Sequence, residues 1–321
     1  MPDTTDRALV TGGAGFIGSH VTERLLNRGL EVHVLDNLVA GTDEHVPSQA
    51  TLHEVDLRDD RVGQLVRELD PSIVLHLAAR HYIPYCNDHP EETFEVNVMG
   101  TRSLCDALRE CDRLDSLVYA SSAAVYPPRD RAHAEHDPAE PMDIYGRTKL
   151  VGEDIVELFA RDTDVPTVSA RLFNVYGPNE TNPHLIPAIL EQLEDGNRSI
   201  ELGNLSPARD FVYAEDVADA FVTLADESDV VTSESAGSDG SYRIYNVGTG
   251  TAYTVRKVAE AVGEALGDDL VVSQATERVR ESDRPRLCAD TTRIERETGW
   301  QPRTEFVDGL RDLLRSEEFL G

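Results

Sequence analysis

The sequence predicts an α/β fold, in which a doubly wound parallel sheet is followed by a smaller C-terminal substrate-binding domain. Short apolar runs alternate with helical repeats, and glycines cluster at the first strand-to-helix turn. An apolar run over residues 73–79 is typical of a parallel strand that is buried on both faces. We expect a first domain over residues 1–173 and a second over 174–321, with 209–248 partly returning to the first.

The chain begins with a predicted β-α-β unit. Residues 8–11 form an apolar run, apolar positions then repeat at helical spacing up to residue 27, and a second apolar run ends in Asp36. Gly12 permits the tight turn after the first strand, Gly15 lets the backbone approach a pyrophosphate, and Gly18 allows close helix–strand contact. The helix start offers free N–H groups and a positive dipole end to phosphates.

Asp36 lies where a carboxylate accepts a hydrogen bond from a ribose hydroxyl and repels a 2′-phosphate, so the predicted cofactor is NAD in preference to NADP. The run 55–57 is expected to be a later strand that places Asp56 near the adenine. Further candidates for the cofactor site lie at the helix start and at strand ends: Phe16, Ile17, Asn37, Leu57, Leu77, Ala78 and Ala79.

A predicted strand over residues 117–120 leads into Ser122, and strand ends of such sheets face the ligand crevice. Tyr145 and Lys149 are four residues apart and share one face of a predicted helix. A phenol must lose roughly three pKa units to act as a base near neutrality, and an ammonium about 4 Å away supplies about that energy. We therefore predict that Tyr145 is the base, that Lys149 acidifies it while both contact the cofactor, and that Ser122 orients a substrate alcohol.

Composition excludes several partner classes. The formal net charge is −30, and a nucleic acid or an anionic membrane requires a basic footprint. No apolar run approaches the length of a spanning helix, and the N-terminus lacks the features of a signal peptide. The four cysteines have no metal-type spacing. We expect a cytoplasmic protein that binds no metal.

The acidity itself suggests a salt-rich cytoplasm. Carboxylates outnumber basic residues by 60 to 30, and Lys149 and Lys257 are the only lysines. At molar salt the Debye length falls to about 3 Å, which screens the self-repulsion of such a chain. We interpret the composition as halophilic.

Taken in order, several segments resemble those of the extended short-chain dehydrogenase/reductases, and more narrowly the NAD-dependent sugar-nucleotide epimerases. They are the glycines at 12–18, Asp36, the His-Leu-Ala-Ala run at 76–79, Asn97, the Ser-Ser-Ala-Ala-Val-Tyr run at 121–126, and Tyr145 with Lys149. The resemblance implies a Rossmann-type cofactor domain and adds Asn97 to the cofactor site. It also implies epimerisation of a nucleotide sugar, of the UDP-glucose/UDP-galactose type, through a transient keto sugar. A homodimer formed by the helix after Asn97 and the Tyr145 helix is implied too.

The resemblance also implies substrate contacts beyond Ser122 and Tyr145: Asn174, His184, Leu185, Arg209, Arg280 and Asp283. His184 departs from the Asn of the family, and Ser282 replaces a Gly. The two arginines suit a diphosphate, which favours charge-assisted donors.

Alternatives stay open at this point. Ala123 and Ala124 stand where the family's dehydratases carry an acid pair, which argues against dehydration. Other UDP-sugar or UDP-uronate epimerases or decarboxylases, and a catalytically silent NAD-binding regulator, are compatible with the sequence. The bulky stretch 81–86 either lines the sugar pocket or packs beneath it. Trp300 is expected to anchor the smaller domain.

Overall fold

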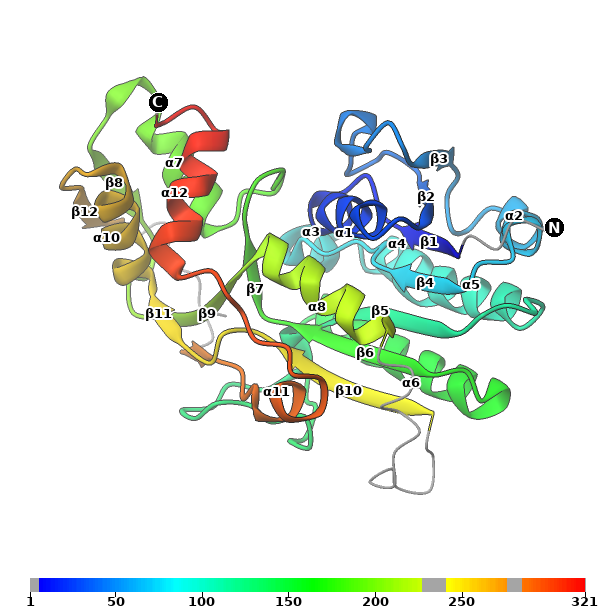
Figure 1. The fold of residues 1–321 in the computed structure, drawn as a ribbon. Helices are drawn as coiled ribbons and strands as arrows, with labels where there is room; N and C mark the ends of the chain where they lie inside the picture. The colour runs from blue at the N-terminus through cyan, green and yellow to red at the C-terminus, as the bar shows by residue number, and fades with distance from the viewer. Residues whose placement is uncertain (1–5, 227–240, 276–284, 321) are drawn as a thin grey trace.

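A seven-stranded parallel sheet forms the larger part of the protein (Figure 1). The computed structural model describes residues 6–226, 241–275 and 285–320. The strands of this sheet are, in spatial order, β10 (Tyr242–Val247), β6 (Thr167–Leu172), β5 (Ser116–Ser122), β4 (Ile73–His76), β1 (Arg7–Thr11), β2 (Glu31–Asp36) and β3 (Thr51–Glu54). The order reverses at β1, where β4 and β2 lie on opposite sides, so a crevice opens at the carboxyl ends of these strands.

Helices cover both faces of the sheet because alternate strand residues point to opposite sides. In β1, Ala8 and Val10 pack on one face with the helices α1 (Phe16–Asn27) and α8 (Ala214–Asp226), while Leu9 packs on the other. Figure 1 shows α8 crossing in front of the sheet. The opposite face carries α2 (Arg61–Leu69), α5 (Gly100–Leu108) and α6 (Ile144–Thr163). This is the doubly wound α/β arrangement that the sequence predicts.

Short helical segments connect these elements. They are the 3-10 turns Asp43–His45 and Ala123–Val125, α3 (Ile83–Asp88), α4 (Pro90–Phe94) and a π-helical turn, Glu95–Met99, which runs directly into α5.

The remaining elements form a second, smaller body, on the left of Figure 1. Its strands are β7 (Asn174–Tyr176), β9 (Ala208–Tyr213), β11 (Ala252–Thr254) and β13 (Arg286–Leu287), with the separate pair β8 (Ser199–Leu202) and β12 (Val271–Gln274). Its helical segments are α7 (Leu185–Leu193), the 3-10 turn Glu194–Gly196, α10 (Val255–Leu266) and α12 (Phe306–Ser316). These elements share a core of their own, in which Ile189, Val262 and Leu310 are fully buried.

The chain crosses between the two bodies more than once. After β9 it returns to the large sheet as α8 and β10, and α11 (Thr292–Thr298) packs beside β10. Trp300 follows α11, and its indole Nε1 donates to the carbonyl of Asp216 in α8 at 3.2 Å. The expectation that Trp300 anchors the smaller domain is therefore wrong, because the returning chain carries it into the core of the large sheet.

Two segments predicted as strands from the sequence differ in the structure. The strand expected over 73–79 stops at His76, because its partner β1 ends at Thr11 and the chain then turns at Gly12, which has φ +73°. Likewise β3 ends at Glu54, opposite the last residue of β2, so residues 55–57 leave the sheet and lead into a turn instead of forming a strand. Both overestimated segments leave the sheet at its carboxyl edge.

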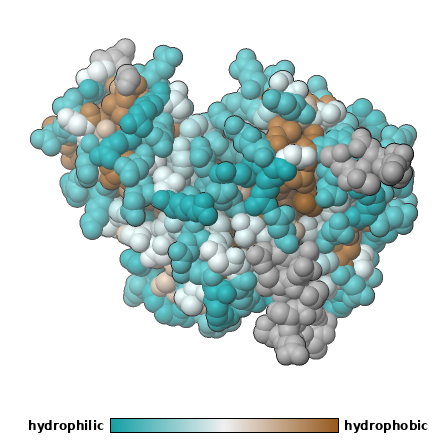
Figure 2. Space-filling model, viewed as in Figure 1, coloured by the Kyte–Doolittle hydropathy of each residue, from teal (hydrophilic) through white to brown (hydrophobic). Residues whose placement is uncertain are grey.

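The face of the molecule in Figure 2 is largely hydrophilic, in line with the acidic composition. Within the residues that the structure describes, no helix combines the length and apolarity needed to cross a membrane. The four cysteines are free thiols, and Cys111 alone among them is partly exposed.

Candidate active site

A cavity of about 1000 Å³ lies between the two bodies, at the carboxyl edge of the large sheet. With one exception among the described residues, it gathers every predicted site residue along its wall. On the cofactor side these are Gly12, Gly15, Phe16, Ile17, Gly18, Asp36, Asn37, Asp56, Leu57, Leu77, Ala78, Ala79, Tyr145 and Lys149. On the substrate side they are Ser122, Asn174, His184, Leu185 and Arg209. Arg280 and Asp283 lie outside the described residues, so their predicted roles stay predictions.

The glycine turn forms a cradle that side chains would fill. A Cβ on Gly12 would lie 2.7 Å from the backbone nitrogen of Ala78, and one on Gly18 would lie 2.0 Å from the Gly12 carbonyl oxygen. The N-cap of α1 is Gly15, which has no side chain to cap the helix, and the first-turn residues line the cavity. This arrangement fits a dinucleotide diphosphate, because the amides of a helix start bind phosphate oxygens.

Asp36 is held with its carboxylate at the wall of the same cavity. Its Oδ2 accepts from the amide of Ala14 at 3.0 Å and its Oδ1 from the amide of Leu38 at 2.9 Å. Each oxygen keeps a lone pair for a ribose hydroxyl, and the negative charge opposes a 2′-phosphate. The residues present therefore fit NAD.

Asp56 and Asn37 form one hydrogen-bonded pair where the sequence predicts the adenine, with the Asn37 amide donating to Asp56 Oδ2 at 2.7 Å. The Arg58 guanidinium also binds this carboxylate and holds the pKa of Asp56 well below its usual range. Asp56 is therefore an anionic acceptor at neutral pH.

Among the described residues, Asn97 is the one predicted site residue that does not line the cavity. Its side chain is buried, accepts from the amide of Arg80 at 2.7 Å and donates to Thr148 Oγ1 at 2.9 Å, and it does not line the cavity. In this arrangement Asn97 ties the loop after β4 to α6. Contact between Asn97 and the cofactor stays a prediction.

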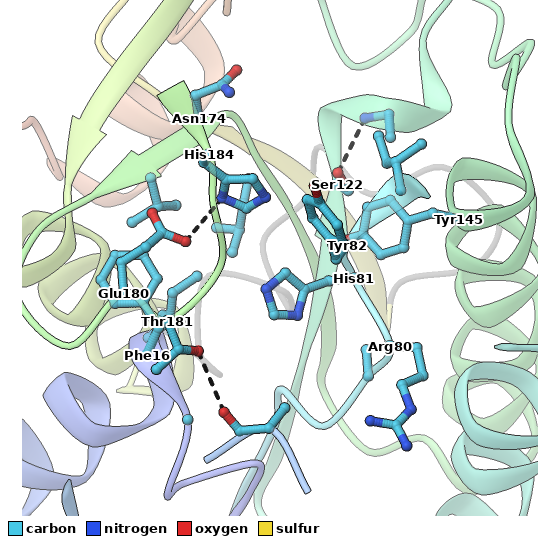
Figure 3. Close-up of a pocket in the computed structure, with 18 of the residues that line it drawn as sticks. Phe16, Arg80, His81, Tyr82, Ser122, Tyr145, Asn174, Glu180, Thr181 and His184 are labelled. Atoms are coloured by element: carbon cyan, nitrogen blue, oxygen red, sulfur yellow. Dashed lines mark hydrogen bonds and ion pairs between the residues drawn. The ribbon is translucent and has the colours of Figure 1, made fainter. Parts of the chain in front are cut away.

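Ser122, Tyr145 and Lys149 line the cavity where β5 ends and α6 begins, and Figure 3 shows Ser122 and Tyr145 on the same side of it. Ser122 is the last residue of β5, and its Oγ accepts from the amide of Ala124 at 3.1 Å. Gly146 lets the first turn of α6 approach this segment, since a Cβ there would lie 2.4 Å from the carbonyl oxygen of Ala124. The Lys149 ammonium donates to the carbonyl of Ala120 at 2.7 Å and lies 5.9 Å from the centroid of the Tyr145 ring.

Burial dominates the protonation of both groups in the protein alone. It raises the pKa of the Tyr145 phenol, which a hydrogen bond with Ser122 lowers only in part, and it lowers the pKa of Lys149 to about 7. The geometry thus brings the predicted trio together, and the acidification of Tyr145 by Lys149 stays a prediction for the loaded enzyme.

The pKa of Lys149 can be measured directly because the chain has only two lysines. In Lys257→Arg protein grown on lysine labelled with ¹³C at Cε, the single remaining signal reports Lys149. We expect it to titrate in NAD-free protein with a midpoint near pH 7, charged below and neutral above, because burial disfavours the ammonium. A midpoint near the ordinary lysine value of about 10.4 would contradict this expectation.

The smaller body forms the side of the cavity where the substrate is predicted to bind. Asn174 lies at the start of β7 and Arg209 in β9, and both line the cavity. His184 is the N-cap of α7, and its Nδ1 lies 2.9 Å from Glu180 Oε1 (Figure 3). The helix that the sequence predicts from His184 onward is confirmed as α7.

Sequence reasoning missed several residues of the cavity. Glu180 and Thr181 lie in a loop without a recognisable pattern, and only the tertiary fold brings that loop against the cofactor side. The question left open for residues 81–86 is answered in part, because His81 and Tyr82 line the cavity (Figure 3) while Cys86 is fully buried.

Comparisons with known proteins agree with this geometry. The family model "NAD dependent epimerase/dehydratase family" matches residues 8–248. UDP-glucose 4-epimerase of Corynebacterium glutamicum is 32% identical over 312 residues, which cover 92% of this chain and 91% of that protein. The crystal structure of the Thermus thermophilus UDP-glucose 4-epimerase in complex with NAD superposes with a TM-score of 0.84 at 35% identity, covering 98% of each chain. UDP-N-acetylglucosamine 4-epimerase of Methanobrevibacter ruminantium, in complex with UDP-N-acetylmuramic acid, superposes with a TM-score of 0.85 at 25% identity, again covering 98% of each.

The match covers the cofactor cradle, the Ser122–Tyr145–Lys149 group and the returning strand β10 within one family model. The chain therefore belongs to the NAD-dependent epimerase/dehydratase family, and it is an NAD-dependent epimerase.

Proposed function

We propose that the protein is a UDP-sugar 4-epimerase that interconverts UDP-glucose and UDP-galactose. The observation that carries the proposal is the meeting of Ser122, Tyr145 and Lys149 in a cavity continuous with the glycine cradle. The relatives named as UDP-glucose 4-epimerases support it. The alanines at 123 and 124 leave no acid pair next to Ser122 for the removal of water.

In this reaction Tyr145 takes the proton of the C4 hydroxyl while Ser122 hydrogen-bonds the same oxygen. NAD held by the glycine cradle and Asp36 would supply the acceptor for the C4 hydride and the donor that returns it to the other face of the sugar. Tyr145 then gives the proton back to the C4 oxygen. Asn174 and Arg209 hold the diphosphate end, which lets the sugar turn while the nucleotide stays fixed.

The direct test is to incubate the purified protein, supplied with NAD and molar KCl, with UDP-glucose or UDP-galactose and to separate the products by chromatography. We expect each sugar nucleotide to yield the other. If neither is converted, the glucose/galactose assignment fails. Conversion of UDP-N-acetylglucosamine or a UDP-uronate in its place would move the substrate to that sugar.

We further propose that the enzyme is a homodimer paired through α5 and α6. These helices pack on each other, and large apolar side chains remain exposed on α6 and next to α5: Leu158 is 51% exposed and Met99 57%. In sedimentation at 2 M KCl we expect a dimer that Leu158→Glu dissociates. Val271→Glu is the control, since Val271 is 64% exposed on β12, in the other body. A wild-type protein that sediments only at 35.4 kDa would contradict the dimer.

The halophilic interpretation is also a proposal, and it predicts a salt response. We expect the melting temperature to rise as KCl increases from 0.1 to 2 M, because screening of the net charge of −30 relieves repulsion in the folded state. Differential scanning fluorimetry measures it, with sucrose of equal osmolality as the uncharged control. A melting temperature that is independent of KCl would refute the proposal.

A further inference from the structure

The loop between β7 and α7 bridges the cavity to the cofactor domain. We call residues 177–184 the strap. Two left-handed backbone positions set its path, Gly177 with φ +154° and Asn179 with φ +71°. Glu180, Thr181 and His184 line the cavity, and the Glu180 side chain is only 5% exposed (Figure 3). The strap thus presents one side to the interior of the site.

Two contacts fasten the beginning of the strap to α1. Asn179 Nδ2 donates to Ser19 Oγ at 3.2 Å, and His20 Nε2 donates to the carbonyl of Pro178 at 3.1 Å. Ser19 follows Gly18 directly, so this attachment lies beside the cradle for the diphosphate.

Two more contacts fasten its middle to other loops of the cofactor domain. Thr181 Oγ1 donates to the carbonyl of Ala40 at 3.4 Å, in the loop that follows Asp36 (Figure 3). Asn182 Nδ2 lies 3.0 Å from His81 Nε2, in the loop that follows β4. Burial lowers the pKa of His81 to about 4, so this imidazole is neutral and its Nε2 accepts the hydrogen bond.

The four attachments follow β1, β2 and β4, the three strands whose carboxyl ends surround the predicted dinucleotide. None of them involves Asn174 or Arg209 on the substrate side. The strap is therefore fastened to three loops that border the predicted dinucleotide site.

We propose that the strap retains NAD in the enzyme between turnovers, with Asn179, Thr181 and Asn182 as positioning residues that latch it to the cofactor domain. The inference rests on the proposed function in one respect: an epimerase has to return the hydride that it removes, so its cofactor must not exchange during a turnover.

The test measures the release of NAD, independently of activity. Protein loaded with radiolabelled NAD is mixed with excess unlabelled NAD, and the label that stays with the protein is followed by rapid gel filtration. We expect Asn179→Gly, Thr181→Val and Asn182→Ala each to accelerate release by roughly 3- to 10-fold. This is the fold-change that corresponds to the loss of one hydrogen bond. The triple variant should accelerate it further. Asn179→Gly keeps the left-handed backbone, and Thr181→Val keeps the side-chain shape.

Asn197→Ala is the matched control, because the Asn197 side chain lies in the exposed turn before β8 and hydrogen-bonds the backbone of nearby Ser199, far from the strap. It should release NAD at the wild-type rate, and UDP affinity measured by calorimetry should be unchanged in every variant. Release at the wild-type rate from the triple variant would overturn the proposal, as would weakened UDP binding with unchanged NAD release. If the triple variant does not fold, Thr181→Val alone decides the question. If the strap variants release NAD faster but the wild-type protein converts no UDP-sugar, the proposed function is wrong and the proposal about the strap is still supported.

Discussion

Replacing Tyr145 by Phe should lower the turnover of UDP-glucose by about 10³-fold or more, while NAD stays bound. The substitution removes one oxygen, and with it the group that we propose takes and returns the proton of the C4 hydroxyl. The glycine cradle and Asp36, which fit the cofactor, are untouched. Turnover is measured by chromatography of the sugar nucleotides, and bound NAD by its release on acid denaturation.

The control is Tyr242→Phe, another half-buried tyrosine, whose hydroxyl donates to Ser169 at 2.8 Å and which does not line the cavity. It should keep wild-type turnover apart from a small effect on stability. If Tyr145→Phe turns over at a rate close to wild type, the base lies elsewhere and the proposed mechanism is lost.

Replacing Glu153 by Gln should destabilise the protein by about 3 kcal/mol or more, because it leaves a buried guanidinium without its counter-ion. Glu153 and Arg171 have side chains 5% and 4% exposed, and Arg171 contacts both carboxylate oxygens, Nε to Oε1 at 2.8 Å and Nη2 to Oε2 at 2.6 Å. Ser121 also donates to this carboxylate. We expect the melting temperature to fall by roughly 5 to 10 °C.

The Glu153–Arg171 pair also lies next to the active site. Glu153 lies one helical turn after Lys149, and Ser121 lies next to Ser122, so the network holds α6 against the end of β5. Arg171 extends it to Tyr126, whose hydroxyl donates to Asn246 on β10.

Glu157→Gln is the control for this substitution. Glu157 is on the same helix and pairs with Arg161 at 3.3 Å, but its side chain is 40% exposed, so the expected change is below about 0.5 kcal/mol. The double variant Glu153→Leu/Arg171→Met should recover part of the lost stability, because it leaves no unpaired buried charge. Equal melting temperatures for Glu153→Gln and Glu157→Gln would show that the buried pair does not carry this energy.

Much of the fold was predictable because its signals are local. The apolar run ending at Thr11, the glycines up to Gly18 and the acid at residue 36 each follow from steric or electrostatic needs of neighbouring residues. The four-residue spacing of Tyr145 and Lys149 likewise follows from helix geometry. Strand lengths were not predictable in this way, since β4 stops where its partner β1 stops and not where its own apolar run ends.

Long-range placement was decided by the tertiary structure alone. Trp300 packs with the large sheet because the chain returns there after β9, and nothing near residue 300 in the sequence records that return. The strap reaches His81 and Ser19 across about 100 and 160 residues of chain, and these contacts exist only once two bodies close on each other. The protonation of Lys149 was also decided by the tertiary structure, because burial among distant segments lowers its pKa. The spacing of residues in the sequence shows only which groups are neighbours on a helix.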